Sequence, residues 1–403
     1  MVKKKVIKLH SLDGIKLSSI YSGMYPKKRL DLSIIELDEK SIVSGVFTKN
    51  KAKSPSVIIS EKHLKSGQPR YLIINSGNAN AGTGADGIKD IEQYCKELEK
   101  EFSCNFKDIL VFSTGVIGER IKKNNIIKAI PKLKKGLNKE NWIDFSKSIL
   151  TTDTGNKICS KKIKICGETV TITGVAKGSG MIHPNMATML SFVATDIKIS
   201  KIQLNSIHKK LVDRSYNMIT VDGDTSTNDS SILISSRKSK LSYEKLNSKD
   251  KNFFYSSIES MYIELAKCII RDGEGATKFV SINVDKIKNK KQGKSIGMSV
   301  ANSLLVKTAL FAEDPNWGRI LSAIGNSDSS IKDLSNIEIY LGKILIFKNN
   351  KIYEKYNEEF ADKYLKNSDI EINIVINNGK ESVTVWTSDL SYEYIKINAE
   401  YRT

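Results

Sequence analysis

The residues best suited to chemistry lie in one unusual segment, residues 177–190, whose sequence is KGSGMIHPNMATML. Strand-like residues 169–175 lead into this segment, and an apolar run, 189–194, follows it. The glycines and the proline between the two runs predict an irregular connection into a buried strand, with Thr188 at its first position. The hydroxyl of Thr188 would then be held beside the turn, where it could serve as a nucleophile.

A threonine hydroxyl is a poor nucleophile unless a base lies next to it. One solution is to make the threonine the N-terminus of a chain, because its own α-amino group then acts as the base. That amine titrates near ~7.7–8.0, so a usable fraction of it is neutral at cellular pH. Taken alone, the segment is more simply explained as a glycine-rich turn before a buried strand, with Thr188 chosen for β-propensity.

Segment 177–190 closely resembles the signature of the ornithine acetyltransferase family, also called the bifunctional glutamate N-acetyltransferases. Other segments that resemble those of this family are spread over most of the chain, in one order. They are GVFT at 45–48, INSGNANAG at 74–82, STGVIG at 113–118, TTDT at 151–154, VDGDTSTND at 221–229, RDGEGATKF at 271–279 and EDPNWGRI at 313–320. Such an ordered set is very specific to the family.

The resemblance implies a precursor that cleaves itself between Ala187 and Thr188. The Thr188 hydroxyl would attack the Ala187 carbonyl in an N-to-O acyl shift. Hydrolysis of the resulting ester would separate an α chain, 1–187, from a β chain, 188–403. The freed Thr188 would accept an acetyl group from N-acetylornithine and pass it to glutamate, a ping-pong reaction of arginine biosynthesis. No cofactor and no metal are expected, and acetyl-CoA would be a co-substrate only if the enzyme is bifunctional.

Thr114 and Gly115 match the family's oxyanion-hole pair. Acyl transfer passes through a tetrahedral oxyanion, which a threonine hydroxyl and a glycine N–H can stabilise where it forms. Glycine also lets the backbone approach closely, because it has no Cβ. The alternative is that the two residues form a turn that closes the strand 110–112.

Three internal residues match positions with which the family contacts substrate. Lys177 would bind, as a point charge, the carboxylate that N-acetylornithine and glutamate share. Glu274 would contact an amino group of the substrate, and the alternative is a solvated glutamate in a helix-capping glycine turn. Thr151 matches a substrate-contacting threonine, although the adjacent Thr152 could face the site instead.

Two residues near the C-terminus, Asn398 and Thr403, match the part of the family's chain that folds over the substrate. Chain ends usually fray unless they are tied down, so this role requires an ordered tail. The acidic loop 222–229 lacks the twelve-residue spacing and terminal glutamate of an EF-hand. The sequence therefore favours hydrogen-bonded turns in this loop, which could hold Thr188 from behind.

Short apolar strands that alternate with amphipathic helices must position these residues. Three apolar stripes at 3- and 4-residue steps predict core-facing helices. These stripes are Ile88, Ile91, Cys95, Leu98 and Phe102; Leu204, Ile207, Leu211 and Ser215; and Phe254, Ile258, Met261, Leu265 and Cys268. In the last third of the chain, residues 337–341 before Gly342 predict a hairpin, and the runs 370–376 and 383–386 around Asn378-Gly379 predict another. Residues 392–397 predict a last strand.

Mixed sheets covered by helices place the chain in the α/β or α+β class. The resemblance implies the more specific α/β architecture, in which layered mixed sheets are sandwiched by helices, as in self-cleaving N-terminal-nucleophile enzymes. The length of 403 residues suggests two or three folding units, or one large α/β body.

The net charge of +19 arises from 64 basic and 45 acidic residues, but only eight of the basic residues are arginine. Bidentate recognition of phosphates and bases favours arginine, and basic grooves for single strands usually contain interleaved aromatic residues. We therefore interpret the charge as a solvated surface and expect no nucleic-acid partner. The five scattered cysteines are typical of reduced thiols in a cytoplasmic protein. No apolar stretch approaches the ~18 residues of a membrane span, so no membrane partner is expected.

The resemblance also implies a heterotetramer of two α and two β chains. One alternative function is a related self-processing N-terminal-threonine hydrolase or aminopeptidase, in which water and not glutamate accepts the acyl group. A further alternative, from a different class, is a basic binding protein that retains the scaffold. Such a protein would remain a single unprocessed chain of 45.0 kDa.

Overall fold

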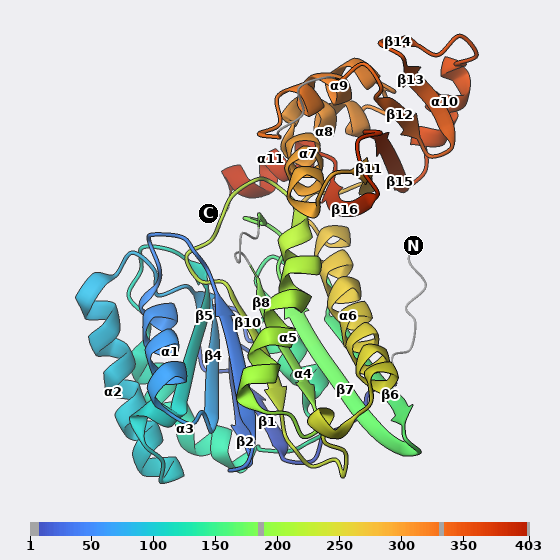
Figure 1. The fold of residues 1–403 in the computed structure, drawn as a ribbon. Coiled ribbons are helices and arrows are strands. Elements are labelled where there is room, and N and C mark those ends of the chain that lie inside the picture. Colours follow the sequence, from blue (N-terminus) through green and yellow to red (C-terminus); the bar gives the residue numbers. More distant parts are fainter. Residues whose placement is uncertain (1–7, 184–188, 330–333, 401–403) are drawn as a thin grey trace. The chain divides into compact units, whose positions relative to one another are not determined.

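The computed structural model describes residues 8–183, 189–329 and 334–400. The chain forms two compact units, drawn in Figure 1. Unit 1 consists of 1–178, 184–217 and 225–266, and unit 2 consists of 179–183, 218–224 and 267–403. These bounds describe folding units, so they differ in kind from the expected cleavage products 1–187 and 188–403. None of the described helices is long and apolar enough to span a membrane.

Unit 1 contains two mixed sheets, with strand orders β1-β2-β4-β5 and β3-β10-β8-β7-β6. The strands are β1 (Ile15–Ile20), β2 (Leu32–Leu37), β3 (Ile42–Phe47), β4 (Tyr71–Asn78), β5 (Ile109–Val116), β6 (Lys157–Ile165), β7 (Glu168–Lys177), β8 (Leu190–Thr195) and β10 (Ser230–Ser235). The pairs β4–β5 and β8–β10 are parallel, and the other pairs are antiparallel.

Six helices are associated with these sheets: α1 (Pro55–Ser66), α2 (Gly84–Phe102), α3 (Lys123–Lys135), α4 (Trp142–Ser148), α5 (Lys201–Arg214) and α6 (Ser248–Arg271), the last of which continues into unit 2. The three predicted apolar stripes coincide with α2, α5 and α6, which confirms those helices. Ser215 is the exception, because it caps the C-terminal end of α5.

The two sheets of unit 1 face each other across an apolar core, and helices cover their outer faces. Strand β4 shows how the sequence produces these layers. Leu72 and Ile74 lie in the core between the sheets, whereas Ile73 belongs to the cluster formed with α2 and α3. Successive side chains of a strand point to opposite faces, so a continuous apolar run buries both faces of the sheet. The predicted class of layered mixed sheets sandwiched by helices is confirmed.

Unit 2 is built on a seven-stranded sheet with the order β14-β13-β12-β15-β11-β16-β9. Its strands are β9 (Ile219–Thr220), β11 (Phe279–Ile287), β12 (Glu338–Leu341), β13 (Ile344–Lys348), β14 (Lys351–Ile352), β15 (Asp369–Val375) and β16 (Glu381–Ser388). Its helices are α7 (Lys290–Asn302), α8 (Leu304–Phe311), α9 (Trp317–Gly325), α10 (Glu358–Leu365) and α11 (Tyr392–Ala399). The predicted hairpin at Gly342 is confirmed by the antiparallel pair β12–β13.

The second predicted hairpin is wrong in its pairing, although both of its strands exist. Strand β11 lies between β15 and β16, parallel to the first and antiparallel to the second. The connection with Asn378-Gly379 therefore crosses the end of β11, where the Asn378 N–H donates to the Lys286 carbonyl at 2.9 Å. A Cβ on Gly379 would lie 2.0 Å from the Ile287 carbonyl oxygen, which leaves room only for glycine.

The last predicted strand, 392–397, is also wrong, because these residues form helix α11. Ser391 caps the helix, since its hydroxyl accepts a hydrogen bond from the Tyr394 N–H at 3.3 Å. Tyr392 and Ile395 are 79% and 59% exposed, so the tyrosine and isoleucine content that suggested a strand is not buried in a sheet.

Candidate active site

Thr114 and Gly115 lie at the carboxyl end of β5, inside the strand and not in a turn. The parallel ladder with β4 is irregular at this point, because Asn78 pairs with both Thr114 and Val116. Gly115 has a φ of +133°, and a Cβ there would lie 2.3 Å from the Gly77 carbonyl carbon. Only glycine fits this conformation and this approach. The irregular ladder therefore fixes the local chain around Gly115. Thr114 is mostly buried there, with 8% of the residue exposed.

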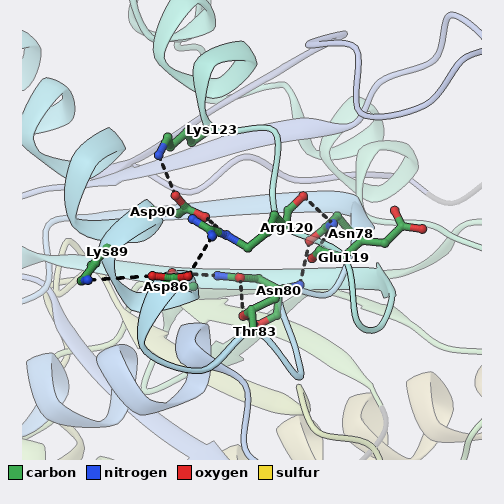
Figure 2. Close-up of polar contacts among 10 residues, drawn as sticks. Asn78, Asn80, Thr83, Asp86, Lys89, Asp90, Glu119, Arg120 and Lys123 are labelled. Carbon is green, nitrogen blue, oxygen red and sulfur yellow. Dashed lines mark hydrogen bonds and ion pairs between the residues drawn. The ribbon is translucent and has the colours of Figure 1, made fainter.

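The loop that follows β5 is held by the polar contacts shown in Figure 2. The Asn78 side-chain amide donates to the carbonyls of Glu119 and Arg120, at 3.2 and 3.4 Å. The side chains of Arg120 and Lys123 bind the buried carboxylate of Asp90 on α2, at 2.6 and 2.8 Å. Burial by itself would raise the pKa of Asp90, but the hydrogen bonds from the two cations outweigh burial and lower it. Asp90 therefore remains an anionic anchor for this loop.

Thr151 and Lys177 are brought together although they are far apart in the sequence. The Lys177 ammonium donates to the Thr151 hydroxyl at 3.2 Å. Lys177 is the last residue of β7 and is 9% exposed. Thr151, one of the two threonines that the sequence left open, is thus in contact with Lys177.

Asp153, which is not among the predicted site residues, links the segment of Thr151 to the end of β7. Its carboxylate accepts hydrogen bonds from the N–H groups of Thr151 and Gly178, at 3.1 and 2.8 Å. It also forms a buried ion pair with Lys157 at 2.5 Å. Burial alone would raise the pKa of Asp153, but the charges of Lys157 and Lys177 and these hydrogen bonds hold it well below its usual range. The TTDT segment contained the only available signal, an aspartate four residues before a lysine.

We expect the Asp153–Lys157 pair to stabilise the protein in a pH-dependent way. The folded-state pKa of Asp153 is below its unfolded value of ~3.9, so the stabilisation is complete above that value and is lost as pH falls toward the folded-state pKa. Asp153→Asn, which removes the anionic partner of the buried Lys157, should cost about 3–5 kcal/mol at pH 7. Thermal unfolding of both proteins between pH 7 and pH 3 should show a difference in Tm that shrinks in acid.

Asp144→Asn is the matched control, because Asp144 forms an exposed pair with Lys147 in which both side chains are more than half exposed. That variant should change the Tm little at any pH. A difference in Tm between wild type and Asp153→Asn that stays constant down to pH 3 would contradict the assigned charge state.

Ala187 and Thr188 lie outside the described residues, and Met189 is the first described residue after them. Strand β8 begins at Leu190, which pairs with Lys177 on one side and with Ser230 on the other. The Ser230 N–H donates to the Met189 carbonyl at 3.0 Å. The described residue nearest in sequence to the expected nucleophile is therefore bonded to the start of β10.

The residues just before β10 are buried and polar. The side-chain amide of Asn228 donates to the carbonyls of Ala79 and Ser113, at 2.6 and 2.9 Å. Burial raises the pKa of the Asp229 carboxyl well above its usual value, although the Lys177 charge and the Met189 N–H act against this shift. The loop 222–229 has local hydrogen bonds to side chains, since the Asp224 N–H donates to the Asp222 carboxylate at 3.2 Å and the Asn228 N–H donates to the Ser226 hydroxyl at 3.1 Å. That this loop holds Thr188 from behind stays a prediction, and Asn228 was not among the predicted site residues.

A second group of predicted residues lies in unit 2. Glu274 is 8% exposed, and its N–H donates to the Ser179 carbonyl at 2.9 Å. Its carboxylate accepts a hydrogen bond from the Asn398 amide at 2.9 Å, so the structure brings these two predicted residues together. A Cβ on Gly180 would lie 2.2 Å from the Glu274 carboxylate, so a larger residue there would displace this carboxylate. Thr403 lies outside the described residues.

The segment 179–183 is anchored to the acidic loop of the same unit. The Asp222 carboxylate accepts hydrogen bonds from the N–H groups of Met181 and Ile182, at 2.6 and 2.8 Å. Met181 has a φ of +55°, an uncommon conformation for a residue with a side chain.

The alternative of a solvated Glu274 is wrong, because its carboxylate accepts a hydrogen bond from Asn398 and the residue is mostly buried.

Comparison with known proteins gives the family. The sequence profile of the ArgJ family matches residues 16–403. The arginine biosynthesis bifunctional protein ArgJ of Methylococcus capsulatus is 40% identical over 397 residues, which are 98% of this chain and 97% of that protein. The protein of the same name from Caldanaerobacter subterraneus is 40% identical over 394 residues, or 97% of each chain.

Two crystal structures are also similar. ArgJ of Bacillus halodurans is 34% identical, with a TM-score of 0.48 over 51% of this chain and 96% of that chain. The ornithine acetyltransferase of Mycobacterium tuberculosis, solved in complex with ornithine, is 25% identical, with a TM-score of 0.39 over 43% of this chain and 92% of that chain. The family match and the full-length relatives confirm the resemblance: the chain belongs to the ArgJ family of bifunctional ornithine acetyltransferases. It is an acyltransferase of arginine biosynthesis.

Proposed function

We propose that this chain cuts itself between Ala187 and Thr188 and then transfers acetyl groups from N-acetylornithine to glutamate through an acetyl-Thr188 intermediate. The cut would leave chain 1–187 and chain 188–403, with a free α-amino group on Thr188. We further propose that acetyl-CoA serves as a second donor, which agrees with the name "bifunctional" given to the relatives.

In the first half-reaction, the Thr188 hydroxyl attacks the acetyl carbonyl, and the α-amine of Thr188 takes the hydroxyl proton. The tetrahedral oxyanion is stabilised by the Thr114 hydroxyl and the Gly115 N–H. Collapse of this intermediate breaks the amide bond, and ornithine leaves with the proton on its nitrogen. In the second half-reaction, the amine of glutamate attacks the acetyl ester and regenerates the free Thr188 hydroxyl.

We propose that the charged groups of the substrate bind side chains of opposite charge, Lys177 in unit 1 and Glu274 in unit 2. Lys177, positioned by Thr151 and Asp153, would bind the carboxylate of either substrate. Glu274 would bind an amino group, since its carboxylate is mostly buried and held by Asn398. Thr403 remains a proposed contact at the C-terminal end.

One observation supports this assignment most directly. The short segment 228–230 bonds both to Met189, which follows Thr188, and to Ser113, which precedes Thr114. Lys177 pairs with Leu190, so the proposed carboxylate-binding residue is adjacent to the same strand start. Within unit 1, the segment 228–230 thus links the proposed oxyanion donors to the chain that follows the nucleophile by hydrogen bonds.

For the assembly, we propose two copies of each chain in the cytoplasm.

Acetyl transfer should depend on both substrates. Purified protein is incubated with N-acetylornithine with and without glutamate, and in parallel with acetyl-CoA and glutamate. We expect N-acetylglutamate and ornithine in equal amounts from the mixture that contains both N-acetylornithine and glutamate. Product in the acetyl-CoA mixture would identify the second activity. Steady release of ornithine without glutamate would indicate the alternative function, a hydrolase, and would contradict the proposal.

A further inference from the structure

The buried side chain of Asn228 links the segment before β10, in one sheet of unit 1, to Ser113 of β5, in the other. The Asn228 amide donates to the carbonyl of Ser113 at 2.9 Å and to that of Ala79 at 2.6 Å. Two residues later, the Ser230 N–H donates to the Met189 carbonyl at 3.0 Å. Three residues of chain therefore span from the end of β5 to the start of β8.

The Ser113 carbonyl is important because it lies in the same peptide plane as the N–H of Thr114. The carbonyl of Ser113 and the N–H of Thr114 belong to one peptide unit, which is rigid. Fixing this carbonyl therefore fixes the position of the Thr114 Cα, from which the Thr114 hydroxyl and the peptide with the Gly115 N–H both extend. A donor on the Ser113 carbonyl thus helps to place the proposed oxyanion-binding residues without touching the substrate itself.

The strand ladder holds this position less firmly than it holds the rest of β5. The β4–β5 register slips at Gly77 and Asn78, where Asn78 pairs with both Thr114 and Val116. The two carbonyls that receive the Asn228 amide, those of Ala79 and Ser113, lie on either side of this irregularity. Asn228 thus supplies hydrogen bonds from outside the sheet where the register within the sheet changes.

Asn228 is itself held firmly enough for this role. It is 7% exposed, and its side-chain oxygen accepts a hydrogen bond from the Thr227 hydroxyl at 2.5 Å. The neighbouring Asp229 carbonyl accepts a hydrogen bond from the Thr48 N–H at 3.0 Å. The two sheets share no ladder among the described strands, so side-chain bonds and core packing, such as that of Phe112 on Phe192, set their spacing.

We propose that Asn228 is a positioning residue for acetyl transfer, because its amide holds the Ser113–Thr114 peptide in register with the strand that begins beside Met189. This inference rests on the proposed roles of Thr114, Gly115 and Thr188. It extends them by assigning a role to a residue that contacts none of the reacting atoms.

The test compares two aspartate substitutions that make the same chemical change. Asn228→Asp removes the amide donor and leaves an oxygen facing the carbonyls of Ser113 and Ala79. Asn80→Asp is the matched control, because Asn80 is also buried and donates its amide to a carbonyl, that of Gly87, at 3.2 Å. That amide contacts the start of α2 and not the Ser113 carbonyl. Asn228→Ala is a second variant that removes the donor without adding a charge.

For each variant, kcat and KM for N-acetylornithine are measured per mole of free Thr188 N-terminus, which is determined by mass spectrometry. Displacement of reacting groups by about 1 Å can cost about 10²-fold in rate. We expect both Asn228 variants to lower kcat by about 10²-fold with an unchanged KM, and Asn80→Asp to leave kcat near that of wild type. Adding Thr114→Ala to Asn228→Asp should lower kcat by less than the product of the two single effects.

Two results would overturn the proposal in distinguishable ways. In the first, Thr114→Ala has a strongly lowered kcat, whereas the Asn228 variants keep a wild-type kcat or show only a lower Tm. Asn228 would then be a structural residue, and the proposed function would stand. If Thr114→Ala itself keeps full activity, the oxyanion assignment fails and the role of Asn228 fails with it.

Discussion

Replacing Thr188 by alanine is expected to leave one uncut chain of 45.0 kDa and to abolish acetyl transfer. The variant lacks the hydroxyl for both proposed reactions, the N-to-O acyl shift and the attack on the acetyl donor. Enzymes that lose a covalent nucleophile can lose a factor on the order of 10⁶ in kcat. Denaturing mass spectrometry of wild type should show two chains that divide between Ala187 and Thr188, and the same measurement on Thr188→Ala should show one.

Thr195→Ala is the matched control for this experiment. Thr195 is a buried threonine at the opposite end of β8, so its loss tests the cost of removing a strand threonine in general. This variant should be cut and should transfer acetyl groups normally. Wild-type protein that stays in one piece and still turns over at full rate would exclude the mechanism with a free Thr188 amine.

Thr114→Ala is expected to lower kcat by a factor of about 10²–10³, with little change in KM for N-acetylornithine. The proposed hydrogen bond from the Thr114 hydroxyl strengthens as negative charge develops on the acetyl oxygen, so its loss is felt mainly in the transition state. Steady-state kinetics of the processed enzyme, with the amount of free Thr188 measured in each sample, give both constants.

Thr114→Ser keeps a hydroxyl at the same position and should recover much of the lost rate. This comparison separates the hydroxyl from the methyl group, which packs at the mostly buried end of β5. An effect of Thr114→Ala that appears only in KM would mean that Thr114 holds substrate and does not stabilise the oxyanion.

The amino-acid sequence by itself determined the family and three of the helices that face the core. The ordered segments between 45 and 320 are local strings, which can be read without knowing the fold. Helices α2, α5 and α6 were equally readable, because an amphipathic helix shows its buried face within its own sequence. The strand-like residues 169–175 and the apolar run 189–194 were also predicted from their own sequence, and they correspond to β7 and β8.

Tertiary structure decided what depends on residues distant in the sequence. Strands β15 and β16 are separated by β11, since main-chain pairing with a strand about 90 residues earlier in the chain replaces the hairpin that Asn378-Gly379 suggests. Helix α11 forms where the composition suggested a strand, because no sheet edge pairs with residues 392–399 and Ser391 caps them instead.

The residues of the candidate site also divide into those that the local sequence predicted and those that only the tertiary structure identified. Thr114, Gly115, Lys177 and Glu274 could be named from motifs, but the residues that hold them could not. Asp153 binds backbone N–H groups on two separate segments, and Asn228 bonds to a carbonyl 115 residues away in the sequence. A side-chain amide that satisfies distant carbonyls leaves no periodic or local signal, because only the folded backbone brings its partners within hydrogen-bonding distance.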